Sequence, residues 1–280
     1  MKIYISHIKD ALRGIYPESE ISSFIKIIVS HIARRPFTPL LLEDLHLTDE
    51  QKTAVEEIVE RLKKKEPIQY ITGECEFFSL PFSVSSDVLI PRPETEELVE
   101  LIIQNSEKNR ALNILDIGTG SGAIAVALAA NLPKAQVEAW DVSPRALGMA
   151  HENAERNGVD ISFSLLDIFE EIPLDQKYDI IVSNPPYVLE SEKEEMDKNV
   201  LDYEPHLALF VPNDKALIFY NRIAEIAKEI LKPNATLYFE INRAKGDETK
   251  EMLIAKGFTD VEVYKDLSQN DRMIKATWAK

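Results

Sequence analysis

The sequence predicts an α/β fold, in which helices cover both faces of a mostly parallel sheet, preceded by a small helical domain. Two observations predict this arrangement. From residue 113 onward, short β-prone runs alternate with helical segments, as in parallel strands joined by crossover helices. Residues 1 to about 66 show apolar residues at helical spacing instead. The chain has 280 residues and is 45% hydrophobic, which is enough for two modest domains with their own cores.

The N-terminal region is predicted to be a helical bundle. Residues 18–35 carry apolar side chains at helical spacing, and Pro36 and Pro39 end that segment. Thr48-Asp49-Glu50-Gln51 has the form of a capping box, so a further helix should begin there. This region holds no chemical motif, and we therefore expect it to dock or position a substrate.

A short β-hairpin is predicted to link the two parts. Phe77-Phe78 and Pro81-Phe82 are β-prone pieces around a turn expected at Leu80-Pro81. Pro93 then suits the first turn of a new helix. The expected domain bounds are 1–73 for the helical domain, 74–90 for the hairpin linker and 91–280 for the α/β domain.

The elements of the α/β domain follow in a regular order. We expect strands at 113–116, 136–141, 161–166, 179–183 and 236–241, and helices at 94–103, 123–130, 144–157, 217–231 and 247–256. Two last β-prone runs, 260–265 and 273–278, are separated only by Asp266–Arg272. That connection is too short for a crossover helix, so the two runs should pair antiparallel.

The motif Asn184-Pro185-Pro186-Tyr187 directly follows the apolar run 178–183. A strand that stops at this point ends at the carboxyl edge of the sheet, where open α/β sheets place their ligands. The prolines lack N–H groups and have a fixed φ, which leaves main-chain carbonyls beside the Asn184 side-chain oxygen as hydrogen-bond acceptors. Such a rigid acceptor cluster suits a planar NH₂ group, although a plain turn is the alternative.

A glycine-rich loop follows the strand at 113–116. Three of the nine glycines of the chain lie in Gly118-Thr119-Gly120-Ser121-Gly122, between this strand and a helix. Glycine there permits positive φ and close approach of the backbone to a ligand. The spacing is one residue short of the dinucleotide motif, which argues against NAD or FAD. We expect the loop and the following helix N-terminus to receive a carboxylate, with Asp116 as a candidate for an ammonium group.

Two further strand ends carry acidic residues. Asp141 closes the run 136–141, at a position where a carboxylate commonly binds a ribose diol. Asp167-Ile168-Phe169 follows the run 161–166 and offers an amino contact and an apolar face to adenine. Helix capping is the alternative for both aspartates. Together these strand ends describe a nucleoside pocket facing an acceptor cluster, which indicates methyl transfer from S-adenosylmethionine with S-adenosylhomocysteine as product.

Charge and composition narrow the function classes. The net charge is −16 and the pI about 4.8, which disfavours nucleic acid as a partner.

The single cysteine, Cys75, fits a reducing compartment, and no apolar stretch is long enough for a membrane span. The start of the chain has no secretory signal, so we expect a cytoplasmic protein. The five histidines are scattered, and we expect no metal site. Segment 190–202 is either a solvated helix or an acidic rim for a basic partner.

At this point the chain resembles the HemK/PrmC family, which methylates the glutamine side-chain nitrogen of peptide chain release factors. The resemblance spans almost the whole chain. It is carried by the glycine loop, by Asn184–Tyr187 and by four more segments: Pro67–Gly73, Ile90–Glu96, Glu204–Leu209, and Asp266-Leu267 with Asp271-Arg272. Two departures are Phe169, where the family often has Trp, and Phe210–Asn213, where glycines are usual.

The resemblance implies a class I S-adenosylmethionine-dependent methyltransferase: a Rossmann-like domain with a seven-stranded sheet and an antiparallel last strand, plus the small N-terminal helical domain. It implies an enzyme that acts on the glutamine of the release-factor GGQ motif, and we expect a monomer. By motif, Gly118–Gly122, Asp141, Phe169 and Asn184 would contact the cofactor, and Asn184, Pro185, Pro186 and Tyr187 would hold the glutamine.

Catalysis is expected to depend on Asn184, Pro185 and Tyr187. Bonds from the amide N–H groups to the Asn184 oxygen and the Pro185 carbonyl would aim the nitrogen lone pair at the methyl group and stabilise its developing charge. Tyr187 would pack on the planar amide. The alternatives are an amino methyltransferase of nucleic acid, acting on adenine N6 or guanine N2, and a catalytically silent binding protein. Acidity disfavours the first of these, and the intact acceptor cluster disfavours the second.

Overall fold

The computed structural model describes residues 2–40 and 46–280. Contacts divide the chain into two compact units. The smaller unit comprises residues up to Gly73 together with Asp197–Tyr203, and the larger comprises Glu74–Met196 and Glu204–Lys280. Each unit has its own buried core, and we describe each separately.

The smaller unit is helical, as the sequence predicts. Its helices are α1 (Lys2–Leu12), α2 (Glu18–Ala33), α3 (Phe37–Leu40), α4 (Asp49–Lys63), α5 (Ile68–Thr72) and α9 (Lys198–Tyr203). The capping box at the start of α4 is confirmed: Gln51 N–H donates to Thr48 Oγ1 at 3.2 Å, and Thr48 N–H donates to Gln51 Oε1 at 3.0 Å. Apolar faces of α1, α2 and α4 enclose the core, where Ile28 and Leu62 are fully buried.

The larger unit is built on a seven-stranded sheet with the order β10-β11-β9-β6-β3-β4-β5. Its strands are β3 (Asn113–Ile117), β4 (Gln136–Asp141), β5 (Ile161–Leu165), β6 (Tyr178–Ser183), β9 (Leu231–Glu240), β10 (Thr259–Lys265) and β11 (Asp271–Trp278). Strands β5, β4, β3, β6 and β9 pair in parallel, whereas β11 is antiparallel to both β9 and β10. The predicted fold class, including the antiparallel last strand, is confirmed.

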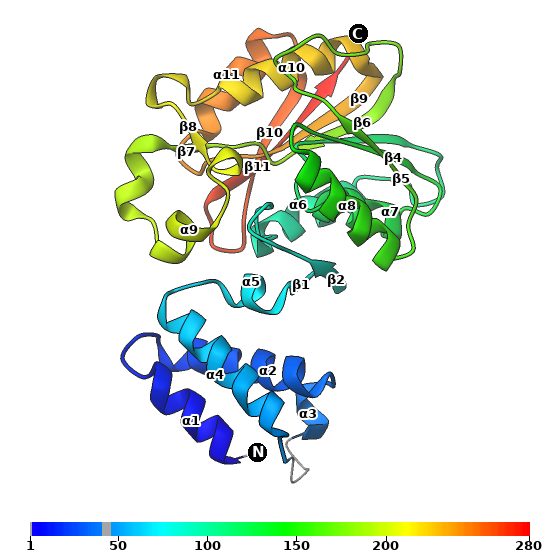
Figure 1. Cartoon of the computed structure of the whole chain (residues 1–280). Helices are drawn as coiled ribbons and strands as arrows, with labels where there is room; N and C mark the ends of the chain where they lie inside the picture. Colours follow the sequence, from blue (N-terminus) through cyan, green and yellow to red (C-terminus); the bar gives the residue numbers. More distant parts are fainter. Residues whose placement is uncertain (1, 41–45) are drawn as a thin grey trace. The chain divides into compact units, whose positions relative to one another are not determined.

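Helices cover both faces of this sheet (Figure 1). They are α6 (Pro93–Gln104), α7 (Ala123–Asn131), α8 (Pro144–Arg156), α10 (Ile218–Ile230) and α11 (Gly246–Ala255). One core lies between the sheet and α6 and α7, and the other between the sheet and α10 and α11. Along β3, Ile114 enters the first core and Leu115 the second, because successive strand side chains point to opposite faces. Burial on both faces explains why the predicted strands are continuous apolar runs.

Short elements complete the larger unit near the carboxyl edge of the sheet. The 3₁₀ helices are η1 (Glu190–Glu195), η2 (His206–Ala208) and η3 (Asn213–Lys215), and β7 (Val188–Leu189) pairs with β8 (Phe210–Val211) in parallel. The segment 210–213, which departs from the family pattern, therefore contributes a short strand and the start of a 3₁₀ helix.

The predicted hairpin forms, but the expected position of its turn is wrong. Strands β1 (Glu74–Phe77) and β2 (Leu80–Ser83) pair antiparallel, and Phe78 and Ser79 make the turn with φ of 51° and 60°. Two consecutive residues with positive φ are the geometry that a two-residue hairpin loop requires. Pro81 lies in the strand opposite Glu76, where a two-stranded ribbon tolerates a residue without an N–H. The hairpin packs on the larger unit, because Phe77 and Phe82 belong to its core.

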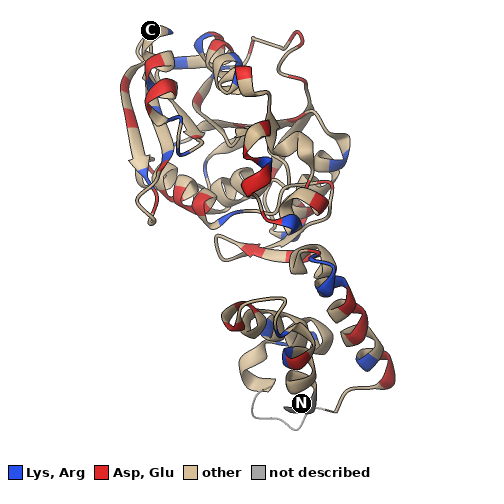
Figure 2. Cartoon of the chain, turned by 90° about the vertical axis from the view of Figure 1, so that its left-hand side faces the viewer, with Lys and Arg blue, Asp and Glu red and all other residues tan. Residues whose placement is uncertain are grey.

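Charged residues are interspersed along both units. Figure 2 shows Asp and Glu on most helices, with Lys and Arg between them. Within residues 2–40 and 46–280, no helix is both long enough and apolar enough to cross a membrane.

Candidate active site

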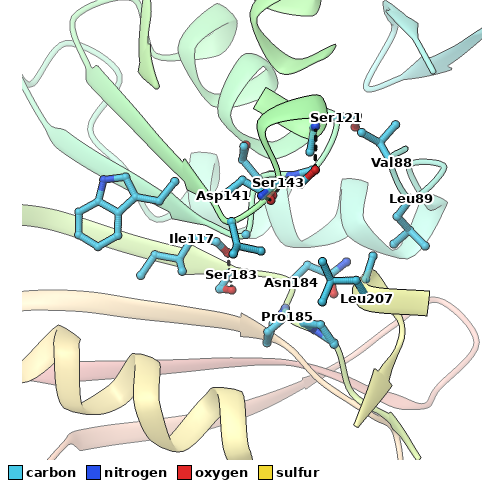
Figure 3. Close-up of a pocket in the computed structure, with 18 of the residues that line it drawn as sticks. Val88, Leu89, Ile117, Ser121, Asp141, Ser143, Ser183, Asn184, Pro185 and Leu207 are labelled. Carbon is cyan, nitrogen blue, oxygen red and sulfur yellow. Dashed lines mark hydrogen bonds between the residues drawn. The ribbon is translucent and has the colours of Figure 1, made fainter. Parts of the chain in front are cut away.

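A cavity of about 340 Å³ opens at the carboxyl edge of the parallel strands, entirely within the larger unit. Residues that follow β3, β4, β5 and β6 line it, as the sequence predicts for ligand-binding loops of an open α/β sheet. Its size lies at the lower end of the range for small-molecule sites. Figure 3 shows Asp141 and Ser143 on one side of this cavity and Asn184, Pro185 and Leu207 on another.

The glycine loop contributes backbone to the cavity wall. Gly118, Thr119, Gly120 and Ser121 line the cavity, whereas Gly122 does not. Gly118 and Gly120 have φ of 75° and 55°, and a Cβ added at either would meet no atom within 4 Å. A positive φ would strain any residue that has a Cβ. At these glycines the open space beside the backbone would let a bound ligand approach closely.

Gly122 has a packing role instead. Its φ is 80°, and an added Cβ would lie 3.0 Å from the Ala150 Cβ in α8. The glycine therefore allows α7 to begin close against α8. The three glycines of the motif thus have different roles: Gly118 and Gly120 border the cavity, and Gly122 permits helix packing.

Most N–H groups of the loop already have protein acceptors. Those of Gly118 and Thr119 donate to the Trp140 carbonyl at 2.8 and 3.0 Å, and that of Gly122 donates to the Thr119 carbonyl at 2.9 Å. Gly120 N–H donates to Asp141 Oδ2 at 2.8 Å. These bonds rigidify the loop, and they leave less of its backbone available for an anion than the glycine spacing suggests.

Asp116 lies beneath the loop and is fully buried. Its Oδ2 accepts a hydrogen bond from Thr119 Oγ1 at 2.6 Å, whereas Oδ1 has no hydrogen-bond partner. The Ala125 N–H, in the first turn of α7, favours the carboxylate form of Asp116. Burial raises the pKa of Asp116 to about 7. Asp116 does not itself line the cavity, so it presents a buried, partly unsatisfied carboxyl directly behind the cavity wall.

Asp141 ends β4 and lines the cavity. Its Oδ2 accepts from Gly120 N–H, and its Oδ1 accepts from Ser143 N–H at 2.8 Å. Burial raises the pKa of Asp141, while these backbone bonds oppose the rise. Asp141 does not cap α8. Ser143 is the N-cap, and its Oγ accepts from Ala146 N–H at 3.2 Å.

The loop after β5 supplies an apolar wall. Asp167 lines the cavity, and its Oδ1 accepts from Phe169 N–H at 2.9 Å. Phe169 is half exposed and does not line the cavity. Its ring packs edge-on against Phe219, with centroids 5.3 Å apart, and Phe219 does line the cavity together with Ile168. The predicted apolar face is therefore made by the neighbours of Phe169, and Phe169 supports one of them.

The motif after β6 reaches the same cavity. Asn184, Pro185 and Pro186 line it, while Ser183 Oγ donates to the Ile117 carbonyl at 2.6 Å and joins the ends of β6 and β3 (Figure 3). Tyr187 does not line the cavity, and its hydroxyl donates to Glu240 Oε1 at 3.0 Å. This bond turns the end of the tyrosine ring toward β9.

Two residues of this site are not among those predicted from the sequence. Thr95 lines the cavity from the first turn of α6, and Glu240 is buried at the end of β9. Asn184 Nδ2 donates to Thr95 Oγ1 at 3.2 Å, and Thr95 Oγ1 donates to Glu240 Oε2 at 2.6 Å. The only available signal was that Thr95 falls in the segment Ile90–Glu96, and that Glu240 ends an apolar strand as Asp141 does.

A further wall comes from two segments distant in sequence. Val88, Leu89, Pro91 and Arg92 line the cavity before α6, and Pro205, Leu207 and Ala208 line it around η2. Leu207 is 66% exposed, so it lies at the mouth. The described residues contain no group of three or more His, Cys, Asp or Glu side chains that could hold a metal ion.

Comparisons with known proteins agree with this architecture. Residues 95–202 match the family model "Methyltransferase small domain", and residues 4–73 match "PrmC N-terminal domain". The chain is 49% identical over 282 residues to a release factor glutamine methyltransferase of Flavobacterium psychrophilum, and the match covers 99% of both chains. It is 45% identical over 273 residues to the Bacteroides thetaiotaomicron protein of that name, covering 97% of this chain and 98% of the relative.

Solved structures support the fold alone. A methyltransferase of Pyrococcus furiosus aligns with a TM-score of 0.54 at 17% identity, over 83% of this chain and all of that one. The 16S rRNA N2 G1207 methyltransferase of Thermus thermophilus, solved with AdoMet and guanosine, aligns with a TM-score of 0.52 at 16% identity, over 73% of this chain and 49% of that one.

Proposed function

This chain belongs to the release factor glutamine methyltransferase family, and we propose that it transfers a methyl group from S-adenosylmethionine to the side-chain amide nitrogen of a glutamine in peptide chain release factors. One observation supports the chemistry most: the acceptor cluster of Asn184 and Pro185 lines the same cavity as Asp141 and the glycine loop. The proposed nucleoside site and the proposed amide-binding cluster would therefore share one cavity.

The cavity suits the cofactor in shape and in charge. Gly118 and Gly120 leave open space beside the backbone, and Asp116 keeps a buried carboxyl oxygen without a partner behind the loop. We propose that Asp141 binds the ribose hydroxyls, that Asp167 binds the adenine amino group and that Asp116 provides the counter-charge for the ammonium group. Ser121 and the first turn of α7 would hold the carboxylate. Gly122 and Phe169 would act through packing.

S-adenosylmethionine supplies the electrophilic methyl carbon when bound. The protein must activate the amide, whose nitrogen is a weak nucleophile because its lone pair is delocalised. Asn184 Oδ1 and the Pro185 carbonyl would accept the two amide N–H groups, which favours a pyramidal nitrogen and stabilises the positive charge that develops on it. The Pro185 carbonyl belongs to a proline-stiffened backbone, and the Asn184 amide is held by its bond to Thr95. Such positioning is worth up to about 7–11 kcal/mol in well-oriented reactions. Pro186 would flank the amide plane, whereas Tyr187 does not line the cavity and would act through its bond to Glu240.

The smaller unit is proposed to dock the release factor. The proposed docking domain is residues 1–73. Residues 74–90 are proposed as the hairpin linker, and residues 91–280 as the methyltransferase domain. Asp197–Tyr203 joins the smaller unit by its contacts, since Tyr203 donates to the Lys64 carbonyl at 3.0 Å. The second half of the acidic segment 190–202 therefore belongs to the proposed docking unit. We further propose that the protein acts in the cytoplasm as a monomer.

The test offers radiolabelled S-adenosylmethionine with release factor, DNA and RNA in parallel, followed by mass spectrometry of the labelled product. We expect label only on the release factor, at the glutamine nitrogen. Label on adenine or guanine would replace this function by that of a nucleic-acid amino methyltransferase. Label on no substrate, with intact cofactor binding, would indicate a silent binding protein.

A further inference from the structure

Asn184 is held by a chain of hydrogen bonds whose direction can be worked out. The chain runs from Asn184 Nδ2 to Thr95 Oγ1 and from Thr95 Oγ1 to Glu240 Oε2. Which end of an asparagine amide faces which partner must be inferred from the hydrogen-bond network around it. Here the network begins at a carboxylate, and a carboxylate only accepts hydrogen bonds.

The single hydroxyl proton of Thr95 decides the direction. The Thr95 hydroxyl donates to Glu240 Oε2 at 2.6 Å, so this proton lies toward Glu240. The Thr95 oxygen then has only lone pairs to offer to Asn184. Asn184 must therefore turn its NH₂ group toward Thr95, which leaves Oδ1 as the end of the amide not held by Thr95.

Glu240 is anchored on every side. It is 1% exposed and Thr95 is 4% exposed, so water does not compete for their bond. The Tyr187 hydroxyl occupies the second carboxylate oxygen, and the Tyr220 hydroxyl donates to the Glu240 carbonyl at 3.1 Å. Burial raises the pKa of Glu240, whereas the bonds from Thr95 and Tyr187 and the charge of Arg272 favour its carboxylate form.

We propose that Thr95 and Glu240 are positioning residues that make the site select a carboxamide over a carboxylate. They set the polarity of the Asn184 amide, so that an oxygen rather than an NH₂ group meets the substrate. A glutamine side chain can donate to that oxygen, whereas an ionised glutamate side chain would place oxygen against oxygen. This inference rests on the proposed function, because it assigns specificity to the same site.

Glu240→Gln provides the sharpest test, because it keeps the shape and reverses the polarity. A glutamine at 240 can donate its NH₂ to Thr95, whose proton would then point to Asn184 Oδ1. The Asn184 amide would be expected to turn and present NH₂ to the substrate. Thr95→Val removes the hydroxyl at nearly constant shape, and Thr95→Ser restores it. Thr249→Val is the matched control, since Thr249 is also buried but lies in α11, away from the cavity, where its hydroxyl donates to the carbonyl of the N-cap residue Lys245.

The measurement compares two ligands on each full-length variant in the presence of S-adenosylhomocysteine: the release factor, and the same factor with its glutamine replaced by glutamate. In the wild type we expect the glutamine form to bind more tightly. Glu240→Gln should reduce that preference at least about tenfold and lower kcat about 100-fold, with cofactor affinity within about twofold of wild type. Thr95→Val should reduce the glutamine preference and kcat, and Thr95→Ser should recover them. Thr249→Val should change neither quantity.

Each outcome has a distinct meaning. A wild type that methylates the release factor, combined with an unchanged glutamine-to-glutamate preference in Glu240→Gln and Thr95→Val, overturns this inference alone. If Thr95→Val loses the glutamine preference and Thr95→Ser does not regain it, the inference is also overturned, because the hydroxyl is then not responsible for the preference. A wild type inactive on the release factor overturns the proposed function together with this inference.

Discussion

Arg92 and Glu204 form an ion pair of 2.6 Å between Nη2 and Oε1, across 112 residues of sequence. The Glu204 side chain is 1% exposed and that of Arg92 is 32% exposed. Ile90 N–H also donates to the second Glu204 oxygen at 3.3 Å. The pair joins the segment before α6 to the segment around η2, and both segments line the cavity. It therefore fixes the wall of the cavity that contains Leu207.

The two members of this pair should differ in their effect on stability. Arg92→Leu leaves the deeply buried Glu204 carboxylate without its counter-ion, and we expect a loss of about 3 kcal/mol. Glu204→Gln leaves Arg92 able to reach water and should cost less, about 1–2 kcal/mol. Urea denaturation of both variants gives the order. A larger loss for Glu204→Gln would mean that the burial of Glu204 does not set the cost.

Asn184→Ala should separate chemistry from cofactor binding. The substitution removes one proposed acceptor of the substrate N–H groups, so kcat should fall at least about 100-fold. The affinity for S-adenosylmethionine, measured by calorimetry, should fall much less because Asp141 and the glycine loop are unchanged. Near-normal methylation by this variant would refute the role of Asn184.

Asp141→Ala should weaken cofactor binding more than it weakens the fold. The carboxylate accepts from Gly120 and Ser143 N–H groups, so its loss should cost about 1–3 kcal/mol of stability. Loss of the proposed ribose contact should lower cofactor affinity at least about tenfold as well. Asp141→Asn is the control, because it keeps one oxygen in place and should lose less of both. Unchanged calorimetric affinity of Asp141→Ala would contradict the ribose role.

Asp116 should make the protein without cofactor less stable as the pH rises from about 4 to 7. Its pKa is 3.8 in the reference state and about 7 when buried, so the unfolded chain releases this proton before the folded chain does. The loss is complete above about pH 7 and amounts to at most about 4 kcal/mol. Asp116→Asn should remove this pH dependence. The unfolding free energy of the variant minus that of the wild type should therefore increase from pH 4 to 7 and then level off.

Thermal unfolding of Asp116→Asn and wild type between pH 4 and 8 measures this effect. Asp160→Asn, at an exposed position, is the control and should show no such trend. The same Asp116→Asn variant should bind S-adenosylmethionine more weakly if Asp116 provides the counter-charge. A stability difference that does not vary with pH would contradict the raised pKa.

Two alanine substitutions in the glycine loop should have opposite patterns. Gly122→Ala forces a Cβ to within 3.0 Å of Ala150 at φ of 80°, and we expect a loss of about 3 kcal/mol from strain and overpacking. Gly118→Ala meets no atom within 4 Å, so only the strain of about 1 kcal/mol remains. Gly118→Ala should nevertheless lose more cofactor affinity, because Gly118 lines the cavity. Equal stability losses in denaturation would contradict the packing role of Gly122.

Much of the fold follows from local sequence signals. The capping box of Thr48, the apolar strand runs and the short link between the last two strands each depend on residues close together in the chain. The glycine loop and Asn184-Pro185-Pro186 could likewise be assigned to strand ends, and those ends meet at one edge because the strands are parallel. The hairpin turn was misplaced because positive φ at Phe78 and Ser79 has no strong residue signal.

The sequence by itself therefore determined the fold class, the family and the candidate edge of the sheet, because those depend on periodicity and on contiguous motifs. Only the tertiary structure decided which side chains pair at that edge of the sheet. Thr95 and Glu240 are 145 residues apart, and their bond depends on how α6 packs against β9. The same packing draws the Tyr187 hydroxyl toward Glu240 and gives Gly122 a neighbour in α8. Pairings of this kind arise from burial, where each polar group must find a partner, and no local pattern encodes which partner that is.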